Sequence, residues 1–403
     1  MKSSSKILAL CAGTAVAVLA WPHLVAAIQA VEPSHNIVVA PGLPGPAASA
    51  PRVEVVFVLD TTSSMGGLID AAKENIWSIA QNMASAQPTP EFRMGLIAFR
   101  DRGDAYITRV SALSADLDSV YATLMDCLPE GGGDGPESVN AALHAAVHQI
   151  QWSPDPKTYK VIFLVGDAPP HMDYQDDVPY PETLKVASRK GIIVNTILAG
   201  HDVGAAAEWK QIAALSQGSF FEVGSSGNAV AVATPFDAEI AALSAAADRT
   251  RLFFGNGEQQ AAMARKSAAA DKLHAGSSVA AQARRAAFNV SDAGVGNKLG
   301  ENELVDAVST GKLDLAEVKA EELPEALRDL DLAQKQALVS AKAKERAELD
   351  TRIGQLSAKR QAYIEGELAK RENTAPSLDA QIQAAVRTQA KDKGLRYEAK
   401  AVH

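Results

Sequence analysis

The stretch that most constrains the fold is VEVVFVLDTTSS, at residues 53–64. An almost uninterrupted apolar run ends abruptly in Asp60, which four consecutive hydroxyl residues follow. A strand this apolar is typical of the centre of a parallel sheet that is covered on both faces. The sudden change to oxygen-bearing side chains marks the carboxyl end of this strand as a candidate ligand site.

Strand and helix patterns alternate from this run to about residue 247. Further strands are predicted at 92–99, 105–110, 160–166, 191–198 and 219–223, with helices at 66–85, 115–128, 136–150, 181–190, 205–216 and 228–247. Such alternation predicts an α/β fold with a doubly wound, mostly parallel sheet flanked by helices. Ligands of these sheets bind beyond the carboxyl ends of the strands, where DTTSS, GGGDGPE and GDAPP should meet.

The flanking regions differ from this pattern. Residues 1–30 combine Lys2 and Lys6 with an apolar run, which is typical of a signal peptide cleaved near Ala27 or Ala30. The alternative is an uncleaved membrane anchor. Either one predicts an exported chain, periplasmic, secreted or held at the membrane. Residues 31–51 are a linker rich in proline, alanine and glycine, and 52–247 form the α/β domain.

Residues 248–403 are rich in helix-forming alanine, lysine, glutamate and leucine, so a helical region is predicted, partly coiled-coil or disordered. Its longest helix should span 333–371. Leu349, Ile353, Leu356 and Tyr363 follow the spacing of a coiled coil, but Arg360 falls on the same seam. A helical hairpin or weak coiled coil and a lone extended helix both stay open. The charged surface is either a solvated face or a surface for self-association.

Asp60, Thr62 and Ser64 stand at D-x-T-x-S spacing directly after the first strand. The motif resembles the metal-ion-dependent adhesion site of von Willebrand factor A-type domains, and the likeness extends over about residues 53–247. One carboxylate and two hydroxyls suit a hard cation such as Mg²⁺, with Mn²⁺ or Ca²⁺ as alternatives. The resemblance implies a cation that coordinates an acidic residue of another protein.

The resemblance also implies ligands from two other loops. Asp167 stands where the family has its second aspartate. GGGDGPE lacks the threonine of the commoner pattern, with Gly133 closest to its position, and it resembles the β-integrin turn Asp-x-Pro-Glu. Glu137, in the first turn of the next helix, would then bind the metal.

The same likeness implies a candidate second cation beside the first. Its ligands would be Asp101, Asp134, Pro136 through its carbonyl, and the shared Glu137. Gly132 stands where those domains have a further side-chain oxygen, so this second set is incomplete.

Simpler interpretations compete with these sites. Serine, threonine and aspartate after a strand are also ordinary helix caps. Arg102-Gly103-Asp104 spells the tripeptide that integrins recognise, but it directly follows a strand and is interpreted as a turn. His171 and Asp173 lie close to Asp167 in the sequence; they are either solvated loop residues or part of the rim of the predicted metal site.

The formal net charge of −9 argues against nucleic acid as a partner. No phosphate-binding loop or nucleophile elbow is present in the sequence. The leading prediction is therefore a non-enzymatic protein of the bacterial envelope that binds another protein through a divalent cation. The alternatives are a structural envelope protein stabilised by the metal, and a metal-assisted hydrolase with His171 as its only candidate base.

Overall fold

The computed structural model describes residues 50–133, 135–224, 232–370 and 378–397. The predicted signal peptide or anchor and residues 31–49 of the linker lie outside these ranges, as does Asp134. In the described part of the chain, no helix is both long enough and apolar enough to cross a bilayer.

Six strands form one sheet, as predicted. They are β1 (Arg52–Asp60), β2 (Glu91–Phe99), β3 (Thr108–Ser114), β4 (Tyr159–Gly166), β5 (Ile192–Ala199) and β6 (Phe220–Val223). Their order is β3-β2-β1-β4-β5-β6, and only β3 runs antiparallel to its neighbour. The strand that carries Asp60 is therefore central, between β2 and β4. This confirms the predicted α/β fold.

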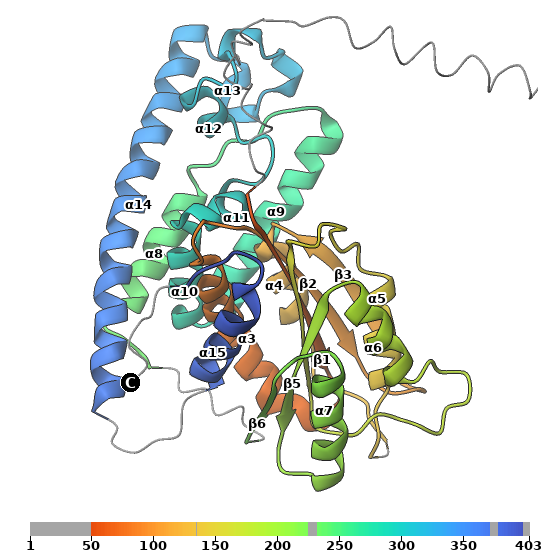
Figure 1. Cartoon of the computed structure of the whole chain (residues 1–403). Helices are drawn as coiled ribbons and strands as arrows, with labels where there is room; N and C mark the ends of the chain where they lie inside the picture. Colours follow the sequence, from red (N-terminus) through yellow and green to blue (C-terminus); the bar gives the residue numbers. More distant parts are fainter. Residues whose placement is uncertain (1–49, 134, 225–231, 371–377, 398–403) are drawn as a thin grey trace, which may run out of the picture. The chain divides into compact units, whose positions relative to one another are not determined.

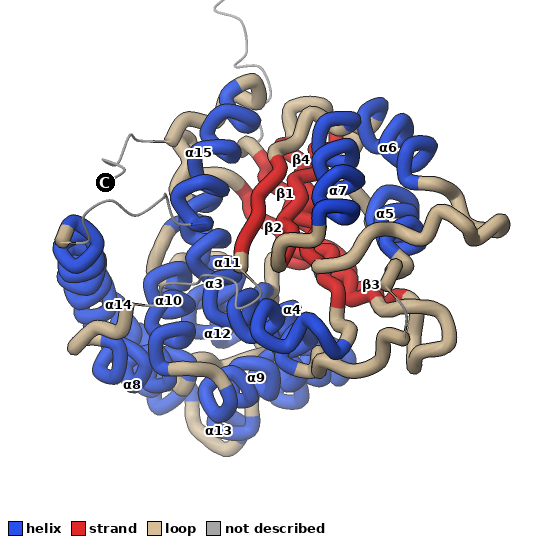
Figure 2. The backbone as a smooth tube through the Cα atoms, turned by 90° about the horizontal axis from the view of Figure 1, so that it is seen from below, coloured by secondary structure: helices blue, strands red, loops and turns tan. Residues whose placement is uncertain are grey.

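Helices cover both faces of the sheet (Figure 2). One face packs against α5 (Val139–His148), α6 (Tyr180–Arg189) and α7 (Val203–Leu215). The other packs against α3 (Gly66–Ala84), α4 (Leu117–Met125), α10 (Val279–Asn289) and α15 (Leu378–Lys391). Because β1, β2, β4 and β5 are covered on both faces, the apolar runs of the sequence become a two-sided core.

Three predicted boundaries were wrong. The edge strand starts at Thr108 rather than 105, because the chain first turns back so that the Arg100 amide donates to the Ile107 carbonyl. Helix α5 starts at Val139 rather than 136, because Glu137 is still extended and pairs with Pro170. The helix predicted at 228–247 is α8 (Asp237–Asp248), which starts beside the hydrogen-bonded pair of Thr234 and Asp237; residues 225–231 lie outside the described ranges.

The helical region shares the core of the sheet. Besides α10 and α15 it contains α9 (Gly257–Gly276), α11 (Val295–Leu299), α12 (Leu304–Ser309), α13 (Glu325–Arg328), α14 (Leu332–Ala369) and three-residue 3₁₀ turns. Phe288 of α10 packs against Trp77 of α3, and Ile382 and Val386 of α15 belong to the same apolar cluster. The division of the chain at residue 247 stays a prediction based on composition.

Helix α14 lies along α8 and also contacts α10 and α12 (Figure 1). Ile353 and Leu356, from the predicted coiled-coil seam, are buried against α8 and α10 within the same chain. Arg360 is buried too, and its Nε donates to Asp237 Oδ1 at 2.7 Å. The apolar seam thus has an intramolecular partner, and the charge that interrupts it is paired.

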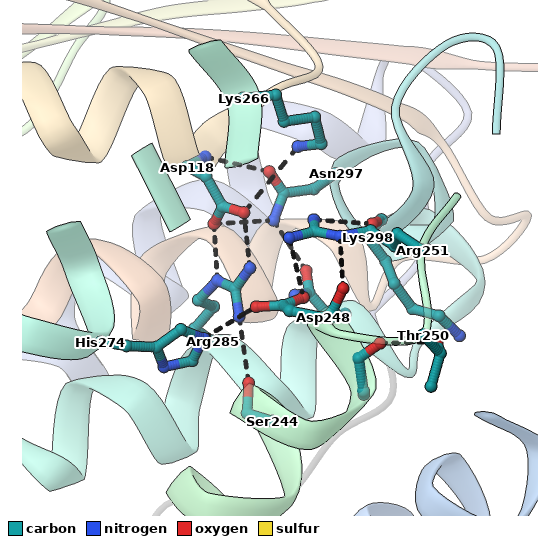
Figure 3. A network of polar contacts seen from close by, with 12 residues as sticks. Asp118, Ser244, Asp248, Thr250, Arg251, Lys266, His274, Arg285, Asn297 and Lys298 are labelled. Carbon is teal, nitrogen blue, oxygen red and sulfur yellow. Dashed lines mark hydrogen bonds and ion pairs between the residues drawn. The ribbon is translucent and has the colours of Figure 1, made fainter. Parts of the chain in front are cut away.

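A buried polar network joins the helical region to α4 (Figure 3). Arg285 of α10 pairs with Asp118 of α4 and with Asp248 at the end of α8. Asn297 of α11 donates to Asp118, and His274 of α9 contacts Asp248 at 2.8 Å. Because buried charges must be paired to be tolerated, this network helps to define how these helices pack on α4.

Candidate metal centre

Asp60, Thr62 and Ser64 come together at the carboxyl end of β1. The backbone amide and the hydroxyl of Thr62 donate to Asp60 Oδ1 at 2.9 and 2.7 Å, and Thr62 Oγ1 lies 3.4 Å from Ser64 Oγ. Asp60 and Thr62 are buried, whereas Ser64 is exposed. The D-x-T-x-S spacing thus places three oxygen-bearing side chains around one point that opens to solvent.

The two intervening hydroxyls point elsewhere. Thr61 Oγ1 donates to the carbonyl of Phe99 at 2.9 Å and contacts the Tyr106 hydroxyl at 2.7 Å. Ser63 Oγ donates to the Gly131 carbonyl at 2.7 Å. These bonds fasten the β1 loop to the loops after β2 and α4, which agrees with the interpretation of Thr61 and Ser63 as spacers between ligands.

Glu137 reaches the same edge from an extended segment, not from the first turn of a helix as predicted. Its amide donates to the Pro169 carbonyl at 2.9 Å, and its carbonyl accepts from the His171 amide at 3.1 Å. Glu137 therefore pairs with the loop that follows β4 and Asp167. This pairing brings the GGGDGPE and GDAPPH loops side by side.

Two glycines make room for these side chains. A Cβ atom at Gly132 would lie 3.3 Å from the Cβ of Thr62 and 3.5 Å from Glu137 Oε1, so Thr62 and Glu137 flank the same glycine. Gly132 also has a φ of +78°, which side chains rarely adopt. A Cβ at Gly166, the last residue of β4, would lie 3.2 Å from the Asp60 Cβ. The half-buried Asp167 follows directly.

The charge of Arg100 compensates the carboxylates of this cluster only in part. Burial raises the pKa of Asp60 to about 7. The charge of Asp167 adds to this rise, whereas the hydrogen bonds from Thr62 oppose it. Burial and the charges of Asp60, Asp101 and Asp167 raise the pKa of Glu137 to about 9. Asp60 Oδ2 and Glu137 Oε2 are buried and have no hydrogen-bond partner. Such bare carboxylate oxygens are costly unless a cation compensates them.

These observations fit a hard divalent cation held by Asp60, Thr62, Ser64, Glu137 and Asp167. In the described ranges, no three His, Cys, Asp or Glu side chains lie close enough together to hold a metal ion, so Asp60, Glu137 and Asp167 do not form a preassembled ligand set. Hydroxyl and carboxylate oxygens are the donors that Mg²⁺ accepts in proteins. The helix-cap alternative finds no support, because the 3₁₀ turn Ser63–Met65 has no side-chain cap at Thr62.

The predicted second set of ligands is described only in part. Asp134 lies outside the described residues, and Pro136 directly precedes the extended Glu137. Both oxygens of Asp101 accept hydrogen bonds from protein hydroxyls. Ser138 Oγ donates to its Oδ1 at 2.8 Å, and the Tyr174 hydroxyl lies 3.1 Å from its Oδ2.

The Arg102-Gly103-Asp104 tripeptide is a turn with both charged side chains engaged. Arg102 donates to Asp176 at 2.8 Å and to Asp177 at 2.6 Å. Asp104 Oδ2 accepts from the amides of Asp101 and Gly132. This agrees with the interpretation of the tripeptide as a turn.

Ser138, Tyr174 and Arg100 were missed by the sequence reasoning. Arg100 is buried beside the site, donates to the Leu128 carbonyl at 2.8 Å, and its charge opposes the rise in the pKa of Asp60. His171, expected at the rim, is buried, with its Nδ1 2.8 Å from Asp173 and its Nε2 3.1 Å from the Tyr174 hydroxyl. The only signal for this contact in the sequence was the spacing His171-x-x-Tyr174, because a tyrosine three residues after a histidine can place its hydroxyl beside the imidazole ring.

Residues 54–230 match the model of the von Willebrand factor A domain family. Two curated relatives match about 120 residues each. The putative ariadne-like RING finger protein R811 of Acanthamoeba polyphaga mimivirus is 26% identical over 119 residues, which are 30% of this chain and 11% of that protein. The von Willebrand factor A domain-containing protein 7 of Mus musculus is 34% identical over 120 residues, 30% of this chain and 12% of that protein. The match thus spans only about a tenth of each relative.

Among solved structures, proximal thread matrix protein 1 from the mussel byssus, with a zinc-occupied MIDAS motif, is 17% identical with a TM-score of 0.34. The match covers 43% of this chain and 42% of that one. The family match covers β1 to β6, the strands that place Asp60 and Asp167 at one edge of the sheet. Residues 54–230 therefore resemble a von Willebrand factor A domain in sequence and have the mostly parallel six-stranded sheet of that fold.

Proposed function

We propose that this domain is a divalent-cation-dependent protein-binding module that recognises an acidic residue of another protein. The observation that carries the proposal is the pair of buried, unpartnered oxygens on Asp60 and Glu137, at the edge of the sheet that also carries the exposed Ser64. When bound, the cation would supply positive charge at an otherwise acidic edge. Domains of this family often mediate metal-dependent protein binding, which supports the same function here.

The ligand set includes neutral hydroxyls, which is why the site suits a carboxylate partner. Thr62 and Ser64 add no negative charge, so a cation held there keeps attraction for a further anion. Thr62 is fixed by Asp60, whereas Ser64 is exposed and leaves that side of the site open. The turn that contributes Glu137 resembles the β-integrin variant, in which a glutamate takes the place of the usual threonine.

Apolar side chains around the site support a protein as the partner. Leu128, Met172 and Val203 are 53%, 51% and 84% exposed. They lie in or at the ends of the loops that precede Glu137, follow β4 and follow β5, at the carboxyl edge of the sheet. Of these three, Met172 is of a type that is more common in protein interfaces than on the remaining surface.

The enzyme alternative has less support. A metal-assisted hydrolase would need a base free to take a proton from water. His171, the only candidate from the sequence, is 4% exposed, and both of its ring nitrogens have partners in the protein. We therefore infer a non-enzymatic binding module. Its export to the periplasm, cell surface or medium rests on the signal-like residues 1–30, and self-association through α14 is a further part of the proposal.

Thermal unfolding with and without Mg²⁺ tests the metal site. We expect Mg²⁺ to raise the Tm of the wild-type protein, since a ligand that binds only the folded state stabilises it. Asp60→Ala should abolish this shift. Asp70→Ala is the matched control, because the Asp70 side chain is 81% exposed on α3 and should leave the shift intact. The absence of any Mg²⁺ effect on the wild type would refute the proposal.

A pull-down from envelope extract then separates protein binding from stabilisation by the metal. We expect one or more proteins to be retained with Mg²⁺, released by EDTA, and lost with Thr62→Ala. An Asp→Asn or Glu→Gln change in the retained protein should abolish its binding. Retention that is indifferent to EDTA and to Thr62→Ala would favour the structural envelope protein instead.

A further inference from the structure

Asp101 is surrounded by hydrogen-bond donors of the protein. It follows β2 closely and is only 5% exposed. Ser138 Oγ donates to its Oδ1 at 2.8 Å, and the hydroxyl of Tyr174 lies 3.3 Å from Oδ1 and 3.1 Å from Oδ2. His171 Nε2 lies 3.4 Å from Oδ2. Both oxygens of this buried carboxylate thus have partners.

Asp60 and Glu137 differ from Asp101 in this respect. Each of them keeps one buried oxygen without any hydrogen-bond partner. A carboxylate that already accepts from hydroxyl groups is largely compensated, whereas a bare oxygen in a buried site needs a cation. A second cation on Asp101 would first have to displace the Tyr174 hydroxyl or that of Ser138.

The contacts of Asp101 connect three segments at the metal edge. Asp101 itself belongs to the loop after β2. Ser138 is the neighbour of Glu137 in the chain, and Tyr174 belongs to the loop between β4 and α6, which begins with Asp167. The Asp101 carboxylate therefore contacts both the segment that carries Glu137 and the loop that carries Asp167.

Arg102 strengthens the same connection. Its guanidinium lies over the Tyr174 ring, 4.0 Å from the centroid, and it pairs with Asp176 and Asp177 farther along the loop. Stacking and ion pairing thus hold Tyr174 where its hydroxyl meets Asp101. Asp101 and Arg102, which follow β2, thus contact the β4–α6 loop both at Tyr174 and at its acidic residues Asp176 and Asp177.

We propose that Asp101 is a positioning residue for a single cation, and not the ligand of a second one. Through Ser138 and Tyr174 it orients Glu137 and the loop of Asp167 toward the ion at Asp60. The inference rests on the proposed function in that it assumes this first ion. It departs from the β-integrin pattern at Asp101, where the protein's own hydroxyls take the place of a neighbouring cation.

Calorimetric titration with Mn²⁺ tests this role, because it reports the number of ions and their affinity separately. We expect the wild-type protein to bind one Mn²⁺. Asp101→Ala should still bind one, with an affinity lower by about 10–100-fold, as is typical when residues that orient metal ligands are lost. Asp101→Asn keeps an oxygen that can accept from Ser138, so its affinity should fall less than that of Asp101→Ala.

Two conservative variants keep the test valid if Asp101→Ala fails to fold. Tyr174→Phe and Ser138→Ala each remove one hydroxyl, and each should weaken Mn²⁺ binding without changing its stoichiometry. Asp70→Ala serves as the control and should bind like the wild type.

The outcomes distinguish the two proposals. Two Mn²⁺ in the wild type and one in Asp101→Asn would overturn the positioning role but leave the first site intact. Unchanged affinity in Asp101→Asn, Tyr174→Phe and Ser138→Ala would also overturn it. No Mn²⁺ binding by the wild type would overturn the proposed function and, with it, this inference.

Discussion

Arg285 and Asp118 form a two-pronged ion pair in the interior of the protein. The Nε and Nη2 atoms of Arg285 each donate to the Asp118 carboxylate at 2.6 Å, and both side chains are fully buried (Figure 3). The two residues are 167 positions apart, one on α10 of the helical region and the other on α4. This contact makes the helical region part of the structure that supports the sheet.

Arg285→Met should strongly destabilise the protein, because it leaves the Asp118 and Asp248 carboxylates buried without their main partner. Removal of one member of a buried ion pair typically costs about 3–5 kcal/mol. Urea unfolding followed by circular dichroism measures this loss. Arg352→Met is the control, since the ion pair of Arg352 with Glu239 is about half exposed and should contribute less than about 1 kcal/mol. Equal effects of the two substitutions would contradict the prediction.

The same network predicts how stability depends on pH. Burial alone would raise the pKa of Asp118 and Asp248, but the charge of Arg285 outweighs it and lowers both below 3.8. A carboxylate with a lowered pKa in the folded state stabilises the fold above its unfolded value. Lys266, His274 and Arg251 also face these carboxylates and favour their charged form.

The free energy of unfolding should therefore fall as the pH drops below about 4. Urea titrations at several pH values between 7 and 3 provide the measurement. The fall should be shallower in Arg285→Met, where the pKa values of the two carboxylates are no longer held down. A wild-type stability that is constant over this range would argue against the assigned charges.

A chain that ends at residue 247 should not fold, although the composition changes there. Phe288 of α10 and Ile382 and Val386 of α15 belong to the apolar core on one face of the sheet, and Tyr159 of β4 bonds Gln389 at 2.7 Å. Removing these helices would expose apolar surface of β1, β2 and α3. We expect aggregation or a loss of cooperative unfolding, seen by gel filtration and calorimetry.

A point substitution isolates the part that α15 plays in this core. Ile382→Ala should cost about 2–5 kcal/mol, as other large-to-small core changes do. Thr388→Ala, on an exposed position of the same helix, should change the stability by less than about 0.5 kcal/mol. A folded, monomeric chain ending at 247 would show that the sheet needs neither α10 nor α15.

The sheet could be predicted from the sequence because its signals are local. The buried run of β1, the order of strands and helices and the D-x-T-x-S spacing each depend on a few consecutive residues. The structure accordingly brings Asp60, Thr62 and Ser64 together as expected. The rule that ligands gather at the carboxyl ends of parallel strands supplied the loops of Glu137 and Asp167.

What could not be predicted depends on contacts between distant segments. The extended conformation of Glu137 requires Pro170 as its partner, so the helix starts later than its proline indicated. Arg360 interrupts the apolar seam of α14. Its hydrogen-bond partner Asp237, which makes its burial there possible, is 123 positions away in the sequence. The hydroxyl of Tyr174 reaches Asp101 across 73 positions. No periodicity or spacing within one segment reports such pairs.

Glu137→Gln should have opposite effects with and without metal. Without metal, the Glu137 carboxylate is buried near Asp60, Asp101 and Asp167, and burial together with these charges raises its pKa to about 9. A raised pKa means that the ionised group destabilises the fold at pH values above its unfolded value. A neutral amide of the same shape removes that penalty, so the Tm in EDTA should rise, by roughly 2–4 °C for each kcal/mol of repulsion removed.

With Mg²⁺ the order should reverse, because the variant has lost an anionic ligand and gains little from the ion. Differential scanning calorimetry of the wild type and Glu137→Gln, in EDTA and in Mg²⁺, gives all four Tm values. Asp70→Asn is the control, since the side chain of Asp70 is 81% exposed on α3 and the substitution should change neither Tm. If Glu137→Gln lowered the Tm in EDTA, its carboxylate would be compensated by the protein itself, and the main reason for placing a cation beside it would be lost.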